Sequence, residues 1–437
     1  MKKILLLIIL IISSQLTFAQ MFEQNSGVSV SLNCVSVFDL NNAWICGDNG
    51  TVLRTSNGGV NWLNLTASGI PVNITLNHIF AVTPSLVLAA GYNATNTWVW
   101  RTTNSGANWQ QVFSQANGFI NAVSIKNDST GFMMGDPVGG RWSIWKTSNN
   151  GAVWDSAGLG LPQAGTEAGY SNCMTYAQTR IWFGTNNTRI YYSSNNGANW
   201  TVQNSSPETD VTAMWFDPNG NTTGYFGGNN IFKSTNYGVN WSGIGSLGSG
   251  LIVGMTGFPM WSGNVMYVRN ASSSIYYGFG TGQWFVYYTA PAGSYNHIGV
   301  ERNSGWPIVG YAVRSNGGIT KFNVFVEGVN QTSGEVPEKF SLSQNYPNPF
   351  NPVTKIKFSI TQNETTHRVV STSLIVYDAL GKEVTILFNQ QLQHGTYEVD
   401  WDASVYPSGV YYYKLEVSPS TGSGRGFTET KKMVLIK

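Results

Sequence analysis

The sequence of 437 residues predicts an all-β protein with two folded parts, and three observations support this prediction. A stretch of eight residues recurs five times before residue 242. The composition combines 49 Gly and 13% aromatic residues with only 11% charged residues, which favours strands, turns and a polar, uncharged surface. Beyond residue 340 the pattern changes to a Pro-rich segment followed by short strands.

The recurring stretch reads Ser/Thr, Ser/Thr, Asn, any residue, Gly, any two residues, Trp. Its clearest copy spans residues 193–200, and successive terminal Trp residues lie 47, 45, 46 and 41 positions apart. Such a period is typical of arrays of small units, and in an all-β chain it predicts the blades of a propeller. The Asn and Trp residues of the five copies are Asn57 and Trp62, Asn104 and Trp109, Asn149 and Trp154, Asn195 and Trp200, and Asn236 and Trp241.

The chemistry of this octapeptide suits the corner of a hairpin. Asn and Gly tolerate a positive φ, the Asn side chain can bind backbone groups nearby, and the Trp can pack between neighbouring units. The stretch resembles the Asp-box, or bacterial neuraminidase repeat, of sialidases, sortilin and photosystem II assembly factor-like proteins. Asn stands in place of the usual Asp and keeps the acceptor oxygen, so we expect the turn to survive. The resemblance implies a structural corner and not a ligand site.

The blade count follows from the repeats and from two further units without the octapeptide. These units lie around Val265–Val268 and Pro307–Ala312 and give an expected total of seven blades, with six and eight as alternatives. The segment Met21 to Gln24 stands alone before the first unit. We expect it to supply the missing strand of the last blade, which closes the ring and removes an exposed edge. Residues 20–330 are thus expected to form a seven-bladed propeller.

The amino terminus has the features of an export signal. Lys2 and Lys3 precede an apolar run over residues 4–12, and small residues at positions 17 and 19 suit cleavage after Ala19. This pattern predicts a secretory signal peptide over residues 1–19. No later segment is apolar enough to cross a membrane.

Charge and cysteine content exclude several classes of function. Residues 20–336 contain 12 Lys and Arg against 13 Asp and Glu, so the expected propeller is nearly neutral and does not predict a nucleic-acid partner. The four His and three Cys lack the spacing of a metal site, and we expect no metal and no cofactor. Cys34 and Cys173 occupy equivalent positions and are expected to be small core residues, with a Cys34–Cys46 pairing as the alternative.

Candidate ligand-binding residues are expected on the face opposite the octapeptide corners, where the resemblance places ligands. Two long polar loops there bring two carboxylates and two Arg to one rim, through Asp136, Arg141, Trp142, Glu167, Asn186 and Arg189. The alternative is ordinary loop chemistry, in which Arg141 only pairs with Asp136 at the surface. Asn-bearing loops around residues 48–49, 92–93, 229–230 and 269–270 would complete a neutral rim that suits a sugar or a peptide.

The carboxyl-terminal segment begins after a linker expected over residues 331–339. Its Pro-rich entry contains Asn345, Tyr346, Pro347, Asn348, Pro349, Phe350, Asn351 and Pro352. Strands are expected at 355–360, 374–377, 383–386, 397–401, 410–417 and 432–436, which predicts a small antiparallel β-sandwich over residues 340–437. This segment resembles the C-terminal sorting domain of the type IX (Por) secretion system. The resemblance implies passage through the outer membrane, followed by release or attachment at the cell surface.

Two classes of function remain. The first is an exported or cell-surface binding protein, expected to be monomeric, whose propeller binds a glycan or protein ligand and whose partner in export is the type IX machinery. The alternative is a glycoside hydrolase on an Asp-box scaffold, sialidase-like or xyloglucanase-like. Hydrolysis needs two carboxylates about 5–10 Å apart, and the expected ligand face carries few acids. The sequence therefore favours a binding protein that is not an enzyme.

Overall fold

The computed structural model describes residues 20–126, 128–218, 222–258, 261–301, 308–324, 329–361, 370–392, 394–403, 406–418 and 426–437. The predicted signal peptide lies outside the described residues. The chain divides into two compact units, the first from residues 21–304 and 308–323 and the second mainly from residues 324–437. Every regular element of the described residues is a β-strand, which confirms the all-β prediction.

The described residues of the first unit form seven antiparallel sheets, six with four strands and the third with three. The first three sheets are built from β2 (Leu32–Val37), β3 (Ala43–Gly47), β4 (Val52–Thr55) and β5 (Leu63–Asn64); β6 (Thr75–Ala81), β7 (Val87–Tyr92), β8 (Asn96–Thr102) and β9 (Gln110–Ala116); and β10 (Ile120–Ile125), β11 (Gly131–Val138) and β12 (Arg141–Thr147).

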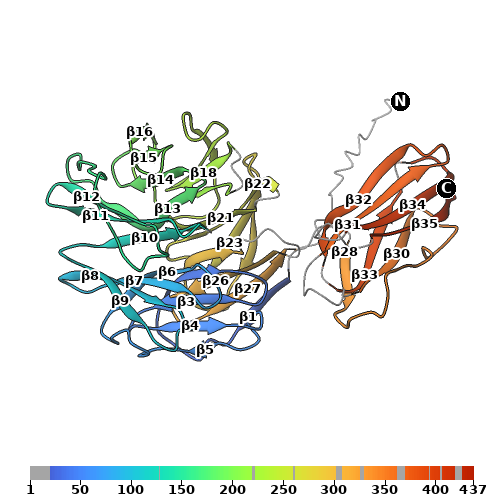
Figure 1. Cartoon of the computed structure of the whole chain (residues 1–437). Helices are drawn as coiled ribbons and strands as arrows, with labels where there is room; N and C mark the ends of the chain where they lie inside the picture. The colour runs from blue at the N-terminus through green and yellow to red at the C-terminus, as the bar shows by residue number, and fades with distance from the viewer. Residues whose placement is uncertain are drawn as a thin grey trace, which may run out of the picture. The chain divides into compact units, whose positions relative to one another are not determined.

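The later sheets continue the same plan, in which consecutive strands pair (Figure 1). Their strands are β13 (Gly169–Ala177), β14 (Arg180–Thr185), β15 (Arg189–Ser193) and β16 (Thr201–Asn204); β17 (Ala213–Phe216), β18 (Gly224–Gly227), β19 (Ile231–Ser234) and β20 (Ser242–Gly245); β21 (Ile252–Phe258), β22 (Trp261–Arg269), β23 (Ser274–Phe279) and β24 (Trp284–Thr289); and β25 (Tyr295–Val300), β26 (Ile308–Arg314) and β27 (Ile319–Val324) with β1 (Gln20–Gln24).

Strand β1 completes the last sheet, because it pairs with β27 although the two strands lie at opposite ends of the first unit. Glu23 forms an ion pair with the buried Arg314 and accepts a hydrogen bond from Thr320 Oγ1 at 2.6 Å. Gln24 Oε1 accepts a hydrogen bond from Trp62 Nε1 at 2.9 Å, which ties β1 to the first sheet as well. The predicted closure by Met21 to Gln24 is confirmed.

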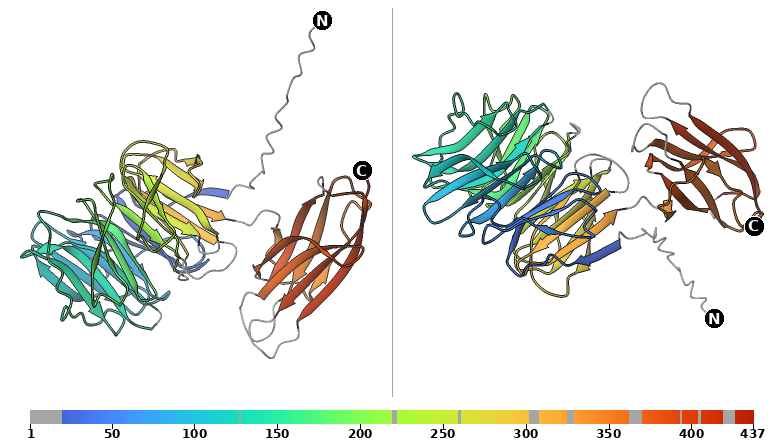
Figure 2. Two further views of the ribbon diagram at one scale, coloured as in Figure 1. Left: turned by 90° about the horizontal axis from the view of Figure 1, so that it is seen from above. Right: turned by 60° about the horizontal axis from the view of Figure 1, so that its bottom comes forward.

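Most neighbouring sheets pack on each other through a shared cluster of buried apolar side chains. Trp44 of the first sheet lies in one cluster with Ile79 of the second, and Leu53 of the first lies in another with Tyr311 of the last. Similar clusters join the second sheet to the third and so on to the sixth, and β21 lies against β25. The sheets therefore follow one another in a cycle that the last sheet closes against the first, and Figure 2 shows their succession.

The octapeptides form five turns with the same hydrogen bonds. In the first turn Thr55 Oγ1 donates to Asn57 Oδ1 at 3.0 Å and accepts from Gly59 N at 2.8 Å, while Asn57 Oδ1 also accepts from Asn61 N at 3.0 Å. The other four copies repeat all three bonds. The Asn oxygen thus works as an acceptor without carrying a charge, as the sequence predicted.

The Gly and Trp of the octapeptide pack onto the preceding sheet. Gly106 has a φ of 81°, and a Cβ there would come within 2.7 Å of Leu65 and 3.0 Å of Trp44. The ring of Trp109 meets the ring of Trp44 edge-on, with 6.1 Å between their centroids. Only Gly meets both demands at this position, and the Trp that follows it fastens neighbouring sheets together.

The second unit contains two four-stranded antiparallel sheets with one shared core. Buried residues such as Phe358 and Leu415 come from different sheets and belong to the same cluster. The strands are β28 (Val329–Ser333), β33 (Gly395–Asp402), β30 (Val353–Ile360) and β29 (Ser341–Leu342), and β32 (Glu383–Leu392), β31 (Val370–Asp378), β34 (Gly409–Ser418) and β35 (Phe427–Leu435). Residues 331–333, expected in a linker, instead end β28 at the edge of a sheet, where polar side chains are tolerated.

The Pro-rich entry is fixed to the second unit by buried hydrogen bonds. Asn345 is 2% exposed, and its amide nitrogen donates to Thr354 Oγ1 at 2.9 Å and to the Pro347 carbonyl at 3.0 Å. The Asn345 backbone N–H donates to Tyr413 Oη at 2.8 Å, and Phe350 N donates to the Val434 carbonyl at 3.0 Å. This entry is therefore an ordered loop held on the second unit.

Removing residues 20–27 from the chain that starts at Gln20 is expected to lower the melting temperature sharply. The deletion opens the edge of β27 and leaves Arg314 buried without Glu23.

The single change Glu23→Gln should cost about 2–4 kcal/mol of the free energy of unfolding, measured by urea denaturation. Phe22→Ala, at a partly exposed position of the same strand, is the control, and an unchanged melting curve of the deletion would contradict closure by β1.

Candidate functional site

Four of the sheets carry an Asn at the same place near the start of their first strand, where a bulge interrupts the pairing with the second strand. In each of these four the Asn follows a fully buried side chain, as in Leu32-Asn33 and Leu76-Asn77. Together with Asn172, which lies one residue before the equivalent place in the fourth sheet, these residues are called the asparagine ring, which consists of Asn33, Asn77, Asn121, Asn172 and Asn296. In the three remaining sheets Cys173, Thr212 and Val253 take the equivalent place.

Three members of the asparagine ring connect consecutive sheets. The side-chain nitrogen of Asn33 donates to the Leu76 carbonyl at 3.0 Å, and that of Asn77 donates to the Ile120 carbonyl at 2.8 Å. Asn296 closes the cycle by donating to the Leu32 carbonyl at 2.9 Å. A carbonyl can only accept, so these contacts fix which branch of each amide is nitrogen. The Asn33 oxygen accepts a hydrogen bond from Ser31 Oγ at 2.9 Å, and the buried Asn77 oxygen has no partner among the described residues.

The ring residues Asn33, Asn77, Asn172 and Asn296 line a cavity of about 430 Å³, which we call the mouth cavity. Its other lining residues are Asp48, Thr75, Tyr92, Phe119, Tyr170, Ser171, Thr212, Leu251, Val253 and Asn270. Asp48 accepts a hydrogen bond from Asn33 Nδ2 at 2.9 Å. Burial raises the pKa of Tyr92, and the nearby Asp48 carboxylate raises it further. Asp48, Tyr92 and Asn270 belong to loops from which the sequence predicted a polar rim.

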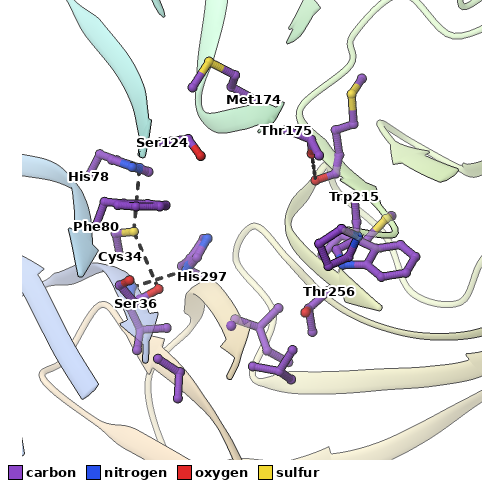
Figure 3. A pocket seen from close by; sticks show the side chains of 18 of the residues that line it. Cys34, Ser36, His78, Phe80, Ser124, Met174, Thr175, Trp215, Thr256 and His297 are labelled. Carbon is purple, nitrogen blue, oxygen red and sulfur yellow. Dashed lines mark hydrogen bonds between the residues drawn. The ribbon is translucent and has the colours of Figure 1, made fainter. Parts of the chain in front are cut away.

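Further along the same strands lies a second cavity of about 240 Å³, the inner cavity, lined by Cys34, His78, His297 and Trp215 among others. Figure 3 shows His78 and Cys34 on one side of it and Trp215 on the other. His78 Nδ1 lies 2.7 Å from Asn172 Oδ1, and Nε2 lies 2.9 Å from the Val123 carbonyl. Burial lowers the pKa of His78, but Cys34, Asn172 and Val123 together outweigh burial and raise it.

All three cysteines are buried and free. Cys34 and Cys46 lie opposite each other on β2 and β3, and Cys173 lies on the first strand of the fourth sheet. Burial raises the pKa of Cys173 to about 12, so its thiol stays protonated. The prediction that Cys34 and Cys173 are core residues is confirmed.

Glu167, one of the predicted rim residues, is almost fully buried at 1% exposure. Its Oε1 accepts hydrogen bonds from Trp142 Nε1 at 3.0 Å, Tyr191 Oη at 2.5 Å and Ala164 N at 2.8 Å. Arg189 Nη1 lies 3.8 Å from Glu167 Oε2. The structure therefore does bring Trp142, Glu167 and Arg189 together, but around a buried carboxylate that holds the loop after β12 in place.

The other predicted rim residues have separate roles. Asp136 Oδ1 accepts from Asn121 Nδ2 and from Gly169 N, both at 2.8 Å, so among the described residues it binds these groups and not Arg141. Burial raises the pKa of Asp136, and the two hydrogen bonds oppose this shift. Asn186 Oδ1 accepts from Ala168 N at 2.8 Å, and Arg141 is exposed at the start of β12. Asp136 thus holds the side chain of Asn121, a member of the asparagine ring, in place by a hydrogen bond.

Sequence reasoning missed the asparagine ring, although a signal for it exists. An Asn recurs in four of the seven units, at a fixed place before a buried strand, as at Asn33 and Asn77. The predicted equivalence of Cys34 and Cys173 is wrong, because Met174 takes the place of Cys34 in the register of the fourth sheet. Nothing in the sequence shows that these amides face one another across sheets. Among the described residues there is no cluster of three or more His, Cys, Asp or Glu arranged to hold a metal ion. The same part of the chain has no helix with the length and apolar character to cross a membrane.

Residues 344–434 match the family of secretion system C-terminal sorting domains, so the second unit carries such a domain. No curated protein sequence matches the chain. The match includes the Pro-rich entry from Asn345 onward and all of β30 to β34.

The first unit has the β-propeller fold, which the solved structures similar to the chain share. YCF48 bound to D1 peptide is 15% identical, with a TM-score of 0.53 and coverage of 70% of this chain and 96% of that chain. YCF48 from Cyanidioschyzon merolae is 15% identical, with a TM-score of 0.55 and coverage of 69% and 98%. The GH74 enzyme of Niastella koreensis is 11% identical, with a TM-score of 0.50 and coverage of 93% and 73%. At these identities the likeness concerns the fold.

The buried Glu301 in the lining of the inner cavity predicts that the stability of the fold depends on pH. Glu301 lines this cavity at 4% exposure, and burial, with a contribution from Asp39, raises its pKa to about 9 from the ordinary 4.5. Between pH 4.5 and 9 the unfolded chain has lost a proton that the folded chain keeps, so the free energy of unfolding falls as the pH rises through this window.

Glu301→Gln replaces the titrating carboxyl by a neutral amide. The substitution should raise the free energy of unfolding by about 1–3 kcal/mol at pH 8 and have little effect at pH 4.5. Thermal melts of the wild type and the variant across this pH range measure the difference. Glu335→Gln, at an exposed position, controls for the loss of one charge. Melting temperatures that follow parallel pH curves would show that Glu301 is ionised in the folded state.

Proposed function

We propose that the chain is an exported binding protein whose seven-bladed propeller holds a peptide or glycan ligand at the mouth cavity, and whose second unit directs it through the type IX secretion system. In this proposal residues 1–19 are a cleaved signal peptide, residues 20–330 form the propeller, and a β-sandwich over residues 340–437 is the sorting domain. The octapeptides are Asp-box corners in which Asn replaces Asp. The protein acts as a monomer, outside the cell or at its surface.

Export is supported by the match of residues 344–434 to the sorting-domain family. The second unit has its own apolar core and its own two sheets, as expected of a domain that folds by itself. The basic and apolar pattern at the amino terminus supports entry into the export route.

Binding is supported above all by the mouth cavity, whose amide and tyrosine lining suits hydrogen bonding to a neutral or positively charged ligand. A volume of about 430 Å³ admits a side chain or a single sugar ring. One of the similar propellers is YCF48 bound to D1 peptide, which makes a peptide the better supported of the two ligands. The proposal carries over only the kind of ligand, not its sequence.

The hydrolase alternative draws on the likeness to the GH74 enzyme. Acid and base catalysis on a glycosidic bond needs two carboxylates that both reach the substrate. Glu167 is buried under three hydrogen bonds, and Asp136 is held by Asn121 and Gly169. The mouth cavity is lined by one carboxylate, Asp48. Binding without hydrolysis is therefore the function that the geometry favours.

The chain from Gln20 to Lys437 is expected to bind members of a peptide or glycan array through the mouth cavity. Asn270 is exposed and lines this cavity, so Asn270→Trp should fill it and weaken binding at least tenfold. Ala94→Trp adds the same bulk to an exposed loop outside the cavity lining and should leave binding unchanged. An array without any bound ligand, or two Trp variants that bind alike, would count against the proposal.

Fusing residues 324–437 to an unrelated periplasmic protein is expected to send that protein to the surface or medium of a host with a type IX secretion system. The segment starts at 324 so that β28, which pairs with β33, is included. The matched control lacks residues 345–352 and should stay in the periplasm, because the buried Asn345 and Phe350 are then missing from the fold. Immunoblots of cell fractions measure where each fusion protein is found. Equal amounts of both fusions at the surface or in the medium would contradict the proposed sorting function of the second unit.

A further inference from the structure

The asparagine ring presents hydrogen-bond acceptors to the mouth cavity. Because the side-chain nitrogens of Asn33, Asn77 and Asn296 donate to carbonyls of the next sheet, their oxygens act as acceptors, and the Asn33 oxygen already accepts from Ser31 Oγ. Asn77 is 6% exposed and lines the cavity, and its Oδ1 is buried with no hydrogen-bond partner among the described residues. A buried acceptor without a donor destabilises the fold, and a ligand with an N–H or O–H group would supply the missing hydrogen bond.

Two hydroxyl groups in the cavity lining are already used as donors. Thr212 Oγ1 donates to the Ile252 carbonyl at 2.5 Å, and Tyr170 Oη donates to Asp210 Oδ1 at 2.5 Å. Each hydroxyl has one hydrogen, so these two groups can only accept from a ligand. Together with the Asn77 oxygen and the Asp48 carboxylate they give the mouth cavity several acceptors, which favours a ligand rich in donors.

The charge around the mouth cavity has one sign. Asp48 is the one Asp or Glu among its lining side chains, which include no Lys, Arg or His. Arg269 lies next to the lining residue Asn270 but is 1% exposed, and its guanidinium donates to the Leu247 and Asn229 carbonyls. The Arg269 charge is thus buried among backbone oxygens, and Asp48 faces the cavity without a cation in the lining.

We infer that the mouth cavity binds the primary ammonium group of a peptide, either a lysine side chain or a free amino terminus. This inference rests on the proposed function and specifies its ligand. An ammonium group has three donors and no acceptor, which fits the unpartnered Asn77 Oδ1 and the Asp48 carboxylate. The rings of Tyr92, Phe119 and Tyr170 add aromatic faces that attract a cation.

The test uses the pentapeptide GGKGG, labelled at its carboxyl end, in four forms: unmodified, acetylated at the amino terminus, acetylated at the lysine, and acetylated at both. Fluorescence polarisation with the chain from Gln20 to Lys437 measures affinity. The unmodified peptide is expected to bind at least tenfold more tightly than the doubly acetylated one, because acetylation removes the charge and leaves one N–H donor in place of three. The two singly acetylated forms show which ammonium group is used.

Asp48→Asn keeps an acceptor for Asn33 but removes the charge, and is expected to weaken binding of GGKGG about tenfold. Asp39→Asn makes the same charge change in the turn between β2 and β3, away from the cavity lining, and should leave the affinity unchanged. Thermal melts check that both variants fold. Asn270→Trp, which should fill the mouth cavity, is expected to weaken binding of GGKGG as well, and it tests the site without changing Asp48.

Equal binding of all four peptide forms, no binding of GGKGG, or equal loss in the Asp39 and Asp48 variants would overturn the inference. A glycan or an uncharged peptide that binds at the cavity in the arrays, while GGKGG does not bind, overturns the ammonium site but leaves the proposed binding function standing. Absence of any ligand in the arrays overturns the binding function itself.

Discussion

The hydrogen bond from a side-chain amide to a carbonyl of the next sheet is the contact on which the centre of the first unit depends. Apolar clusters hold neighbouring sheets together, but such contacts do not depend on the orientation of the groups that make them. The amides of Asn33, Asn77 and Asn296 add direction, because each nitrogen must meet a carbonyl. The same bonds turn the amide oxygens away from the carbonyls, so one set of contacts fixes the sheets and leaves the Asn77 oxygen as an acceptor in the lining of the mouth cavity.

Neutral amides do similar work at the octapeptide turns. Asn57 and its four equivalents accept a backbone N–H and a hydroxyl hydrogen where an Asp could do the same with a charge. The low charge content of the chain therefore reflects a fold held by amides and hydroxyls in place of ion pairs. The ion pair of Glu23 with the buried Arg314 is an exception, and it lies where β1 must be held against β27.

Local chemistry decided which parts of the structure could be predicted. The octapeptide turn depends on bonds within seven residues, and strands in the second unit alternate in exposure, so both were readable in the sequence. Glu167 was predicted at a rim but is buried, since its three donors come from residues up to 25 positions away and no local pattern reveals them. Residues 331–333 were expected in a linker because an edge strand and a linker have similar polar composition.

A crystal structure of the chain from Gln20 to Lys437 with bound GGKGG tests the central claim most directly. We expect the peptide at the mouth cavity, with an ammonium nitrogen about 3 Å from Asn77 Oδ1 and close to the Asp48 carboxylate. The side-chain nitrogens of Asn33, Asn77 and Asn296 should keep their bonds to the next sheet. A peptide bound at the octapeptide turns, or bound at the mouth with its ammonium groups in solvent, would contradict the account.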